Sequence, residues 1–283
     1  MKTDLTTTVY TPQSPLRHPV QLMRGLARDL FRYRQLVWML FTRDLRAGHR
    51  QSLLGYLWLV LPPFSISAIW VILRSQKIIQ IETGIPYILF VLTGMMTWTS
   101  FVAFLTAPQA GLKAGRSVIM KLNVPAEAFI MSSLLRVSFE SLIRFLTLIP
   151  VYLMVGYVPT ANLLLLPVAL VSCFSVACAI GLILTPVGEL YDDIGKGINM
   201  ITRVLMYSVP VIFPLGREGW LNDVLEANPL TPGFMFVRGM LTDGSMEWAR
   251  SAMAIGGAAL VVCVVSVLLF RVSRPHLVER MGM

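Results

Sequence analysis

Long apolar runs recur along this chain and restrict its fold more than any other feature. A helix that crosses a lipid bilayer needs about 20 mostly apolar residues. Such a helix pairs its own backbone groups, which find no water inside the bilayer. Six runs are long enough, and the sequence predicts a membrane-spanning helix over each. They cover residues 53–74, 85–108, 128–154, 161–186, 198–215 and 250–271.

The composition agrees with this reading. Charged residues make up 14% of the chain, against roughly 25% in soluble domains, and the mean hydropathy is +0.69. The first 20 residues are polar, contain proline and lack the apolar centre of a signal peptide. We expect a disordered tail over 1–20 and insertion driven by the first span. The fold class is therefore an all-α polytopic membrane protein.

The positive charges predict the orientation of the spans. Sixteen Lys or Arg lie on one side, counting the N-terminal segment, the alternate loops, the tail and the span end that borders it, and five lie on the other side, in the remaining loops and at the span ends that border them. Cytoplasmic segments carry such an excess, so both termini are expected in the cytoplasm. The net charge of +9 could also indicate nucleic-acid binding. The excess follows the alternation of loops, however, and forms no patch on a soluble domain.

An amphipathic helix is predicted before the first span, over residues 21–48. One face is basic, with Arg24, Arg28 and Arg32. The other face is apolar and comprises Leu26, Leu30, Tyr33, Val37, Phe41 and Leu45. A helix of this kind lies in the membrane interface. It would serve either as a plain anchor or also as a docking surface for a cytoplasmic partner.

The remaining segments complete the predicted organisation. The transmembrane domain covers 49–271 and a cytoplasmic tail covers 272–283. A short basic helix is expected over 112–123, between spans two and three. The external segment 216–249 is too polar to span but rich in apolar residues. We expect it to form re-entrant or interfacial helices, broken at Pro229 and Pro232, that rim a cavity.

Three charged residues inside the third predicted span are candidates for function. Arg136, Glu140 and Arg144 follow one another at steps of four and therefore share a helix face. Charges within a span are costly and face a bundle interior or a watery cavity. They would either satisfy one another as a structural ion pair or line a path for an anionic substrate.

Signatures of enzymes, metals and disulfides are missing. The chain has no GxxxxGK[ST] loop for ATP and no HExxH or GxSxG motif. Asp192 and Asp193 are adjacent without a second acidic motif, so we expect no metal site. Cys173, Cys178 and Cys263 lie in apolar runs, and no disulfide is expected. The residues alone therefore give little support to an enzymatic function.

Five segments resemble a known family, and they occur in the family's order. "RQSLLGYLWLVLPPF" at 50–64 resembles the start of the membrane subunit of bacterial polysaccharide ABC exporters, which move O-antigen, capsule and teichoic acid. The other matches are "LTGMMTWTSF" (92–101), "MKLNVPAEAFIM" (120–131), "VPVIFP" (209–214) and "NPLTPGFMFVRGML" (228–241). The chain departs from the family pattern at Ala126, at Asp192-Asp193 and in "AGHR" before the first span.

The resemblance implies a specific assembly of subunits and a specific substrate. Two copies of the chain would form a channel, and two copies of a separate ATPase subunit, which would bind ATP and Mg²⁺, would dock below it. The substrate would be a polysaccharide on a polyprenyl pyrophosphate carrier. Among such glycans we favour O-antigen of lipopolysaccharide or a similar surface polymer.

The resemblance also assigns roles to particular residues. Arg46, His49 and Arg50 would meet the lipid pyrophosphate at the cytoplasmic interface, since arginine suits phosphate. Lys113, Arg116, Lys121 and Pro125 would couple to the ATPase, and Asn228, Pro229 and Pro232 would shape the exit. Four aromatic residues could either stack on sugars or simply pack: Trp70, Trp98, Tyr207 and Phe213.

Two other functions remain open at this point. The chain could belong to an ABC exporter of a drug or simple lipid. It could also be a membrane enzyme acting on polyprenyl phosphates, which would need Asp192 and Asp193 for catalysis. The amphipathic N-terminal helix and the broken external segment favour export of a polymer.

Overall fold

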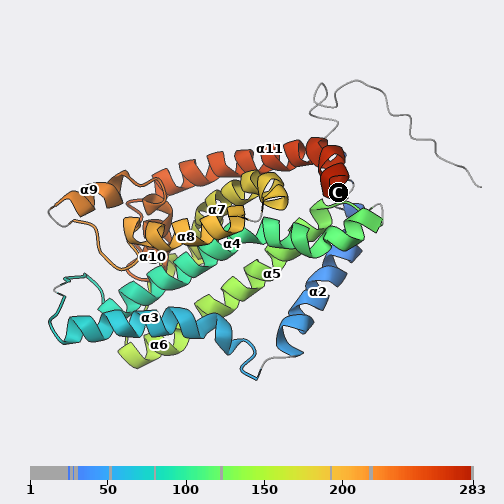
Figure 1. Ribbon diagram of the computed structural model, residues 1–283. Coiled ribbons are helices and arrows are strands. Elements are labelled where there is room, and N and C mark those ends of the chain that lie inside the picture. Colours follow the sequence, from blue (N-terminus) through green and yellow to red (C-terminus); the bar gives the residue numbers. More distant parts are fainter. Residues whose placement is uncertain are drawn as a thin grey trace, which may run out of the picture.

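The described part of the chain folds into helices and contains no strand, in agreement with the predicted fold class (Figure 1). The computed structural model describes residues 25, 28, 31–50, 53–79, 81–121, 124–191, 193–216 and 219–281, with the backbone alone at 48–50, 221 and 272–281. Its elements are α2 (Arg34–Arg50), α3 (Leu57–Ser75), α4 (Tyr87–Lys121), α5 (Glu127–Leu146), α6 (Leu148–Val155), η2 (Ala161–Leu165), α7 (Leu166–Leu190), α8 (Asp193–Leu205), η3 (Met206–Ser208), α9 (Trp220–Ala227), α10 (Thr231–Leu241) and α11 (Ala249–Met281).

Five helical segments within the described residues are long and apolar enough to cross a membrane. Each overlaps one of the six predicted spans. They are Leu57–Ser75, Tyr87–Lys121, Glu127–Val155, Ala161–Leu190 and Ala249–Arg271. The third joins α5 to α6, and the fourth joins η2 to α7.

The predicted span over 198–215 is the exception. Here α8 has 13 residues, a length of about 20 Å at 1.5 Å per residue, against a hydrocarbon core of about 30 Å. The 3₁₀ helix η3 follows, and the chain from Val209 onward is not helical. Pro210 and Pro214 lie in this part, and proline cannot donate the backbone hydrogen bond that a helix interior requires. One continuous helix over 198–215 was therefore the wrong prediction.

Helix α4 forms the centre of the bundle. It has 35 residues, and 72% of its most apolar stretch is buried. Helices α5 and α7 pack along it, and α3 and α10 make further contacts with it. The predicted separate helix over 112–123 does not form, because α4 continues without interruption to Lys121. The second predicted span ended at residue 108, but α4 continues beyond Pro108, which lies inside the helix.

Two glycines explain how α5 packs so closely on the end of α4. A Cβ atom at Gly111 would lie 2.5 Å from the Ser133 hydroxyl oxygen, and one at Gly115 would lie 2.5 Å from the Phe129 ring. Small residues allow helices to approach where lipid supplies no hydrophobic drive between them. The hairpin of α4 and α5 therefore depends on glycine at these positions.

The N-terminal helix α2 packs against α5. Val37, Leu40 and Phe41 are its buried residues, and the Phe41 ring meets the Phe139 ring edge-on at 6.3 Å. Of the predicted apolar face, Leu26 and Leu30 lie outside the described residues. The packed face of α2 thus follows the apolar spacing, while Trp38 and Met39 are exposed.

The segment predicted to be external contains two short helices, α9 and α10, joined at residues 228–230. Helix α10 enters the bundle between α4, α7 and α11, and most of its side chains are buried. Figure 1 shows α9 at the end of the bundle opposite the C-terminus of α11. Pro232 lies in the first turn of α10 and begins this helix instead of breaking it, since an N-terminal proline loses no hydrogen bond there.

Candidate functional site

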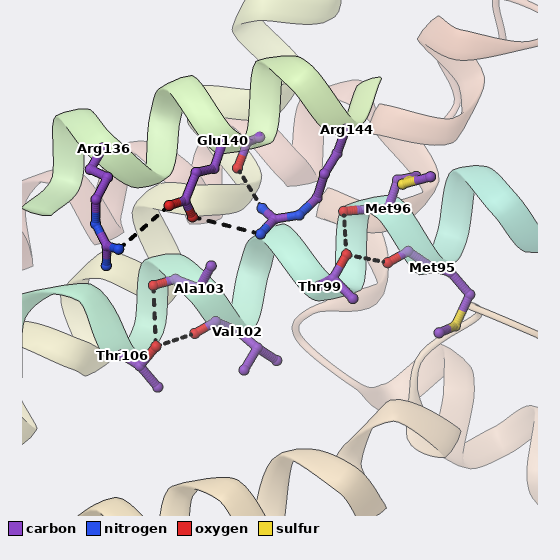
Figure 2. A network of polar contacts seen from close by, with 10 residues as sticks. Met95, Met96, Thr99, Val102, Ala103, Thr106, Arg136, Glu140 and Arg144 are labelled. Carbon is purple, nitrogen blue, oxygen red and sulfur yellow. Dashed lines mark hydrogen bonds and ion pairs between the residues drawn. The ribbon is translucent and has the colours of Figure 1, made fainter. Parts of the chain in front are cut away.

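The three charged residues of α5 form one network, as their spacing predicts (Figure 2). The Glu140 carboxylate lies 3.5 Å from an Arg136 guanidinium nitrogen and 3.8 Å from an Arg144 nitrogen. A second Arg144 nitrogen donates to the Ser141 hydroxyl at 3.5 Å. One carboxylate therefore sits between two guanidinium groups on the same helix.

The two arginines differ in their surroundings. The Arg144 side chain is 8% exposed and the Arg136 side chain is 37% exposed, with Glu140 at 17% between them. The Nε atom of Arg144 is buried and has no hydrogen-bond partner within the described chain. The network thus has an enclosed end at Arg144 and an open end at Arg136.

The wall beside the network belongs to α4. Figure 2 shows the charged side chains of α5 reaching toward the turns of α4 that carry Thr99, Ala103 and Thr106. The Thr99 hydroxyl donates to the Met95 carbonyl at 2.8 Å, and the Thr106 hydroxyl donates to the Val102 carbonyl at 3.0 Å. These three α4 residues are half-buried and short. The wall beside the network is therefore partly polar and consists of short side chains.

A second charged group, Arg238, holds helix α10. This α10 residue is 5% exposed. Its guanidinium carbon lies 3.7 Å from the centre of the Phe90 ring, and one nitrogen donates to the Val211 carbonyl at 3.2 Å and to the Phe90 carbonyl at 3.4 Å. Burial lowers the pKa of Arg238 to about 9, which leaves the group charged at neutral pH. A cation over a ring face is attracted to it, so Arg238 joins α10 to α4 and to the chain after η3.

Gly94 makes this arrangement possible. A Cβ atom at this position would meet the Val211 carbonyl and a guanidinium nitrogen of Arg238. The α4 backbone, the arginine and the non-helical chain therefore meet where only glycine fits.

Side-chain hydrogen bonds fix the chain at both ends of α10. Asn228 donates to the Ser208 carbonyl at 2.7 Å and accepts from the Leu230 amide at 2.9 Å. At the other end, the Tyr152 hydroxyl donates to the Leu241 carbonyl at 2.6 Å. Asn228 was predicted as an exit residue, and it joins the turn between α9 and α10 to the end of η3.

The predicted ATPase-coupling residues lie on or next to the C-terminal end of α4. Lys113, Arg116 and Lys121 are exposed and Pro125 is half-buried. The Arg116 guanidinium lies 3.8 Å from the carboxylate of Glu189, whose side chain is 1% exposed at the end of α7. Nearby, the Gln109 amide donates to the Gly188 carbonyl at 2.8 Å. The ends of α4 and α7 are therefore joined by side chains as well as by packing.

The predicted lipid-binding residues are only partly described. Arg46 is exposed near the end of α2, whereas the side chains of His49 and Arg50 lie outside the described part of the chain. Tyr56 follows nearby, with its ring 6.1 Å from that of Phe139. A pyrophosphate site formed by all three predicted residues stays a prediction.

The four predicted aromatic residues do not form one group. Trp98 lies in the core, where its ring stacks on Phe101 at 5.7 Å and lies 5.8 Å from Phe234. Trp70 and Phe213 meet edge-on at 5.6 Å. Tyr207 is about half exposed. In this chain Trp98 packs, while Tyr207 presents an accessible ring.

The acidic pair shows no metal-binding arrangement where it is described. Asp193 lies 2.9 Å from the Lys196 ammonium on an exposed turn of α8, and Asp192 lies outside the described residues. The described residues contain no group of three or more His, Cys, Asp or Glu able to hold a metal ion.

Three residues of this geometry were not predicted from the sequence. Arg238 was counted among the loop charges, and Gln109 and Glu189 were not singled out. A charged residue inside the apolar run 230–241 is the signal that identifies Arg238. For Gln109 and Glu189 no local signal exists, because their partners are distant in sequence.

Known proteins resemble this chain over most of its length. The O-antigen export system permease protein RfbA of Myxococcus xanthus is 24% identical over 264 residues, which cover 91% of this chain and 99% of the relative. The polysialic acid transport protein KpsM of Escherichia coli is 23% identical over 251 residues, covering 87% and 96%. RfbA of Klebsiella pneumoniae is 19% identical over 219 residues, covering 75% and 82%.

A family model described as ABC-2 type transporter matches residues 35–242. This range runs from the start of α2 to just past the end of α10 and includes both arginine sites described above. Because the match covers well over half of the chain, and the described fold has the apolar helices of a multi-pass membrane protein, the chain belongs to the ABC-2 type transporter family.

Proposed function

We propose that this chain is the channel-forming permease subunit of an ATP-driven exporter that moves polyprenyl pyrophosphate-linked polysaccharide across the inner membrane. The observation that carries the proposal is the similarity, over nearly the whole chain, to permease and transport proteins named for O-antigen and polysialic acid. Both names refer to polysaccharides, which favours a polymer over a drug or simple lipid. We infer that the glycan is O-antigen or a similar surface polymer.

Family membership makes the chain a transporter component and not an enzyme. The separate ATPase would bind ATP and Mg²⁺. The basic, exposed end of α4 supports this division of labour, because it projects cations where a partner could contact them. The links from Arg116 to Glu189 and from Gln109 to Gly188 would carry a movement of α4 to α7.

A second copy of this chain would complete the channel. Exposed polar residues on α8 support this proposal: Lys196, Asn199 and Arg203 lie on one face at helical spacing. Charged and polar groups at membrane depth face a watery cavity or a partner. Two copies that face each other through α8 would enclose these groups, and the short α8 with its non-helical continuation would serve as the sixth crossing in each copy. Both termini would then lie in the cytoplasm.

Co-purification with the ATPase encoded nearest to this chain tests the proposal. The tag is placed on this chain, and the mass of the complex and its ATP hydrolysis are measured. We expect two copies of each subunit and hydrolysis stimulated by lipid-linked glycan. A chain that purifies alone, or that acts on polyprenyl phosphates without an ATPase, would contradict the proposal and favour the membrane enzyme.

A further inference from the structure

The charge network of α5 has an imbalance that its internal pairs do not remove. In the described part of the chain, the ion pairs of Arg136 and Arg144 both go to Glu140. Two guanidinium groups thus share one carboxylate, which leaves one positive charge within a membrane-length segment. An uncompensated charge at this depth is costly, so the arrangement calls for an anion from outside the chain.

The open end of the network determines where an anion could bind. Arg144 is enclosed and receives a further contact from Ser141. Arg136 is more than one-third exposed and lies 3.5 Å from Glu140, a distance longer than a close charge-assisted hydrogen bond of about 2.7–2.9 Å. Its planar fork of donors is therefore only loosely held by the carboxylate and remains able to pair with a second oxyanion.

The neighbouring surface suits a passing polar ligand. Thr99, Ala103 and Thr106 on α4 are half-buried and have short side chains, and they lie beside the charged network (Figure 2). Each threonine hydroxyl donates to its own helix, so its oxygen can still accept a hydrogen bond from a sugar hydroxyl.

We propose that Arg136 is the binding point, within the membrane, for an oxyanion of the exported substrate, with Glu140 as a competing internal partner and Arg144 as the brace of that carboxylate. This inference rests on the proposed function. The oxyanion is the phosphate of the lipid carrier or the carboxylate of an acidic sugar. In both cases the anion displaces Glu140 from Arg136, and Glu140 keeps its pair with Arg144.

The competition gives opposite effects for two neutralising substitutions. Arg136→Gln removes the binding group, so the substrate concentration for half-maximal stimulation of ATP hydrolysis should rise about tenfold, the effect of losing one charge-assisted hydrogen bond. Glu140→Gln removes the competitor, so this concentration should fall about two- to fivefold. Arg136→Lys keeps the positive charge but lacks the planar set of donors of arginine. Its half-maximal substrate concentration should therefore lie between those of wild type and Arg136→Gln.

The experiment uses the complex with its ATPase in lipid nanodiscs and titrates three probes. These are polyprenyl pyrophosphate without a glycan, the carrier with a neutral glycan and the carrier with an acidic glycan. Arg74→Gln is the matched control, since this arginine lies at the end of α3 over the Tyr87 ring and is not part of the α5 charge network. It should change the half-maximal concentration less than twofold.

The outcomes separate the two sources of the anion from failure of the inference. A shift in Arg136→Gln with all three probes identifies the carrier phosphate, and a shift with the acidic glycan alone identifies the sugar carboxylate. If the probes stimulate ATP hydrolysis by wild type and by Arg136→Gln with the same half-maximal concentration, the inference is overturned and the proposed function stands. The same holds if both neutralising substitutions raise the half-maximal concentration together, as a purely structural ion pair requires. A wild-type complex that no probe stimulates contradicts the proposed function, and this inference with it.

Discussion

Two arginine sites of this chain carry the same side chain but hold it in opposite ways. Arg238 is enclosed by the Phe90 ring and by two backbone carbonyls from different parts of the chain. Arg136 has one loose carboxylate partner on its own helix and an exposed side. A guanidinium whose neighbours are all fixed joins segments together. One that keeps an open side can take a ligand.

Replacement of Arg238 should have the largest effect on stability. Arg238→Met keeps a long side chain but leaves the Val211 carbonyl without its donor and removes the contact with the Phe90 ring. We expect a loss of about 2–4 kcal/mol in the free energy of unfolding, from the unpaired carbonyl and the lost cation–π contact. Thermal unfolding in detergent measures it. A midpoint equal to that of wild type would show that Arg238 does not hold α10.

Gly94→Ala should disturb the same junction from the α4 side. The added Cβ would meet the Val211 carbonyl and Arg238, and overpacking of this kind costs about 1–3 kcal/mol. Gly257→Ala on α11 is the matched control, because nothing lies within 4 Å of the added atom. The control should be neutral or slightly stabilising, as alanine is the better helix former. Equal effects of the two substitutions would rule out steric conflict at Gly94 as the cause.

Removal of the carboxylate in the α5 network should have a smaller effect. Glu140→Gln leaves the two arginines without their shared anion, and we expect a loss of about 1 kcal/mol, reduced from that of a fully buried pair by the partial exposure of Arg136. Adding Arg136→Gln to this variant should restore part of the lost unfolding free energy, because Arg144 is then the one charged residue left in the network. A double-mutant cycle of unfolding free energies tests the coupling, and additive losses would exclude it.

Arg136→Gln alone should have the smallest effect on folding. Its pair with Glu140 is partly exposed, and such pairs contribute about 0–1 kcal/mol. A change in unfolding free energy below about 1 kcal/mol is expected, together with the altered substrate response described above. A loss of unfolding free energy as large as that of Arg238→Met would show that the two arginines do not differ in their contribution to folding.

The contrast also explains which parts of the site could be predicted from sequence. Arg136, Glu140 and Arg144 were identified because a helical spacing of four places them together without any knowledge of the fold. Arg238 was missed, because its partners Phe90 and Val211 are 148 and 27 residues away. The link from Gln109 to Gly188 spans 79 residues and was missed for the same reason.

Helix boundaries show the same limit. The apolar runs predicted the five membrane-length helices of the described residues, since a helix that crosses lipid requires a continuous apolar stretch. The run over 198–215 is also apolar, but Pro210 and Pro214 prevent a single helix there. The separate helix predicted over 112–123 does not form, because α4 continues to Lys121 and packs there on α5.

The sequence by itself determined the all-helical membrane fold, the shared face of the α5 charges and the family resemblance, because each depends on local spacing or on segments in order. Only the tertiary structure decided that Arg238 joins three segments, that Trp98 is a core residue and that Arg136 has an open side while Arg144 does not. Burial and long-range partners depend on which helices pack together, and no single stretch of sequence contains that information.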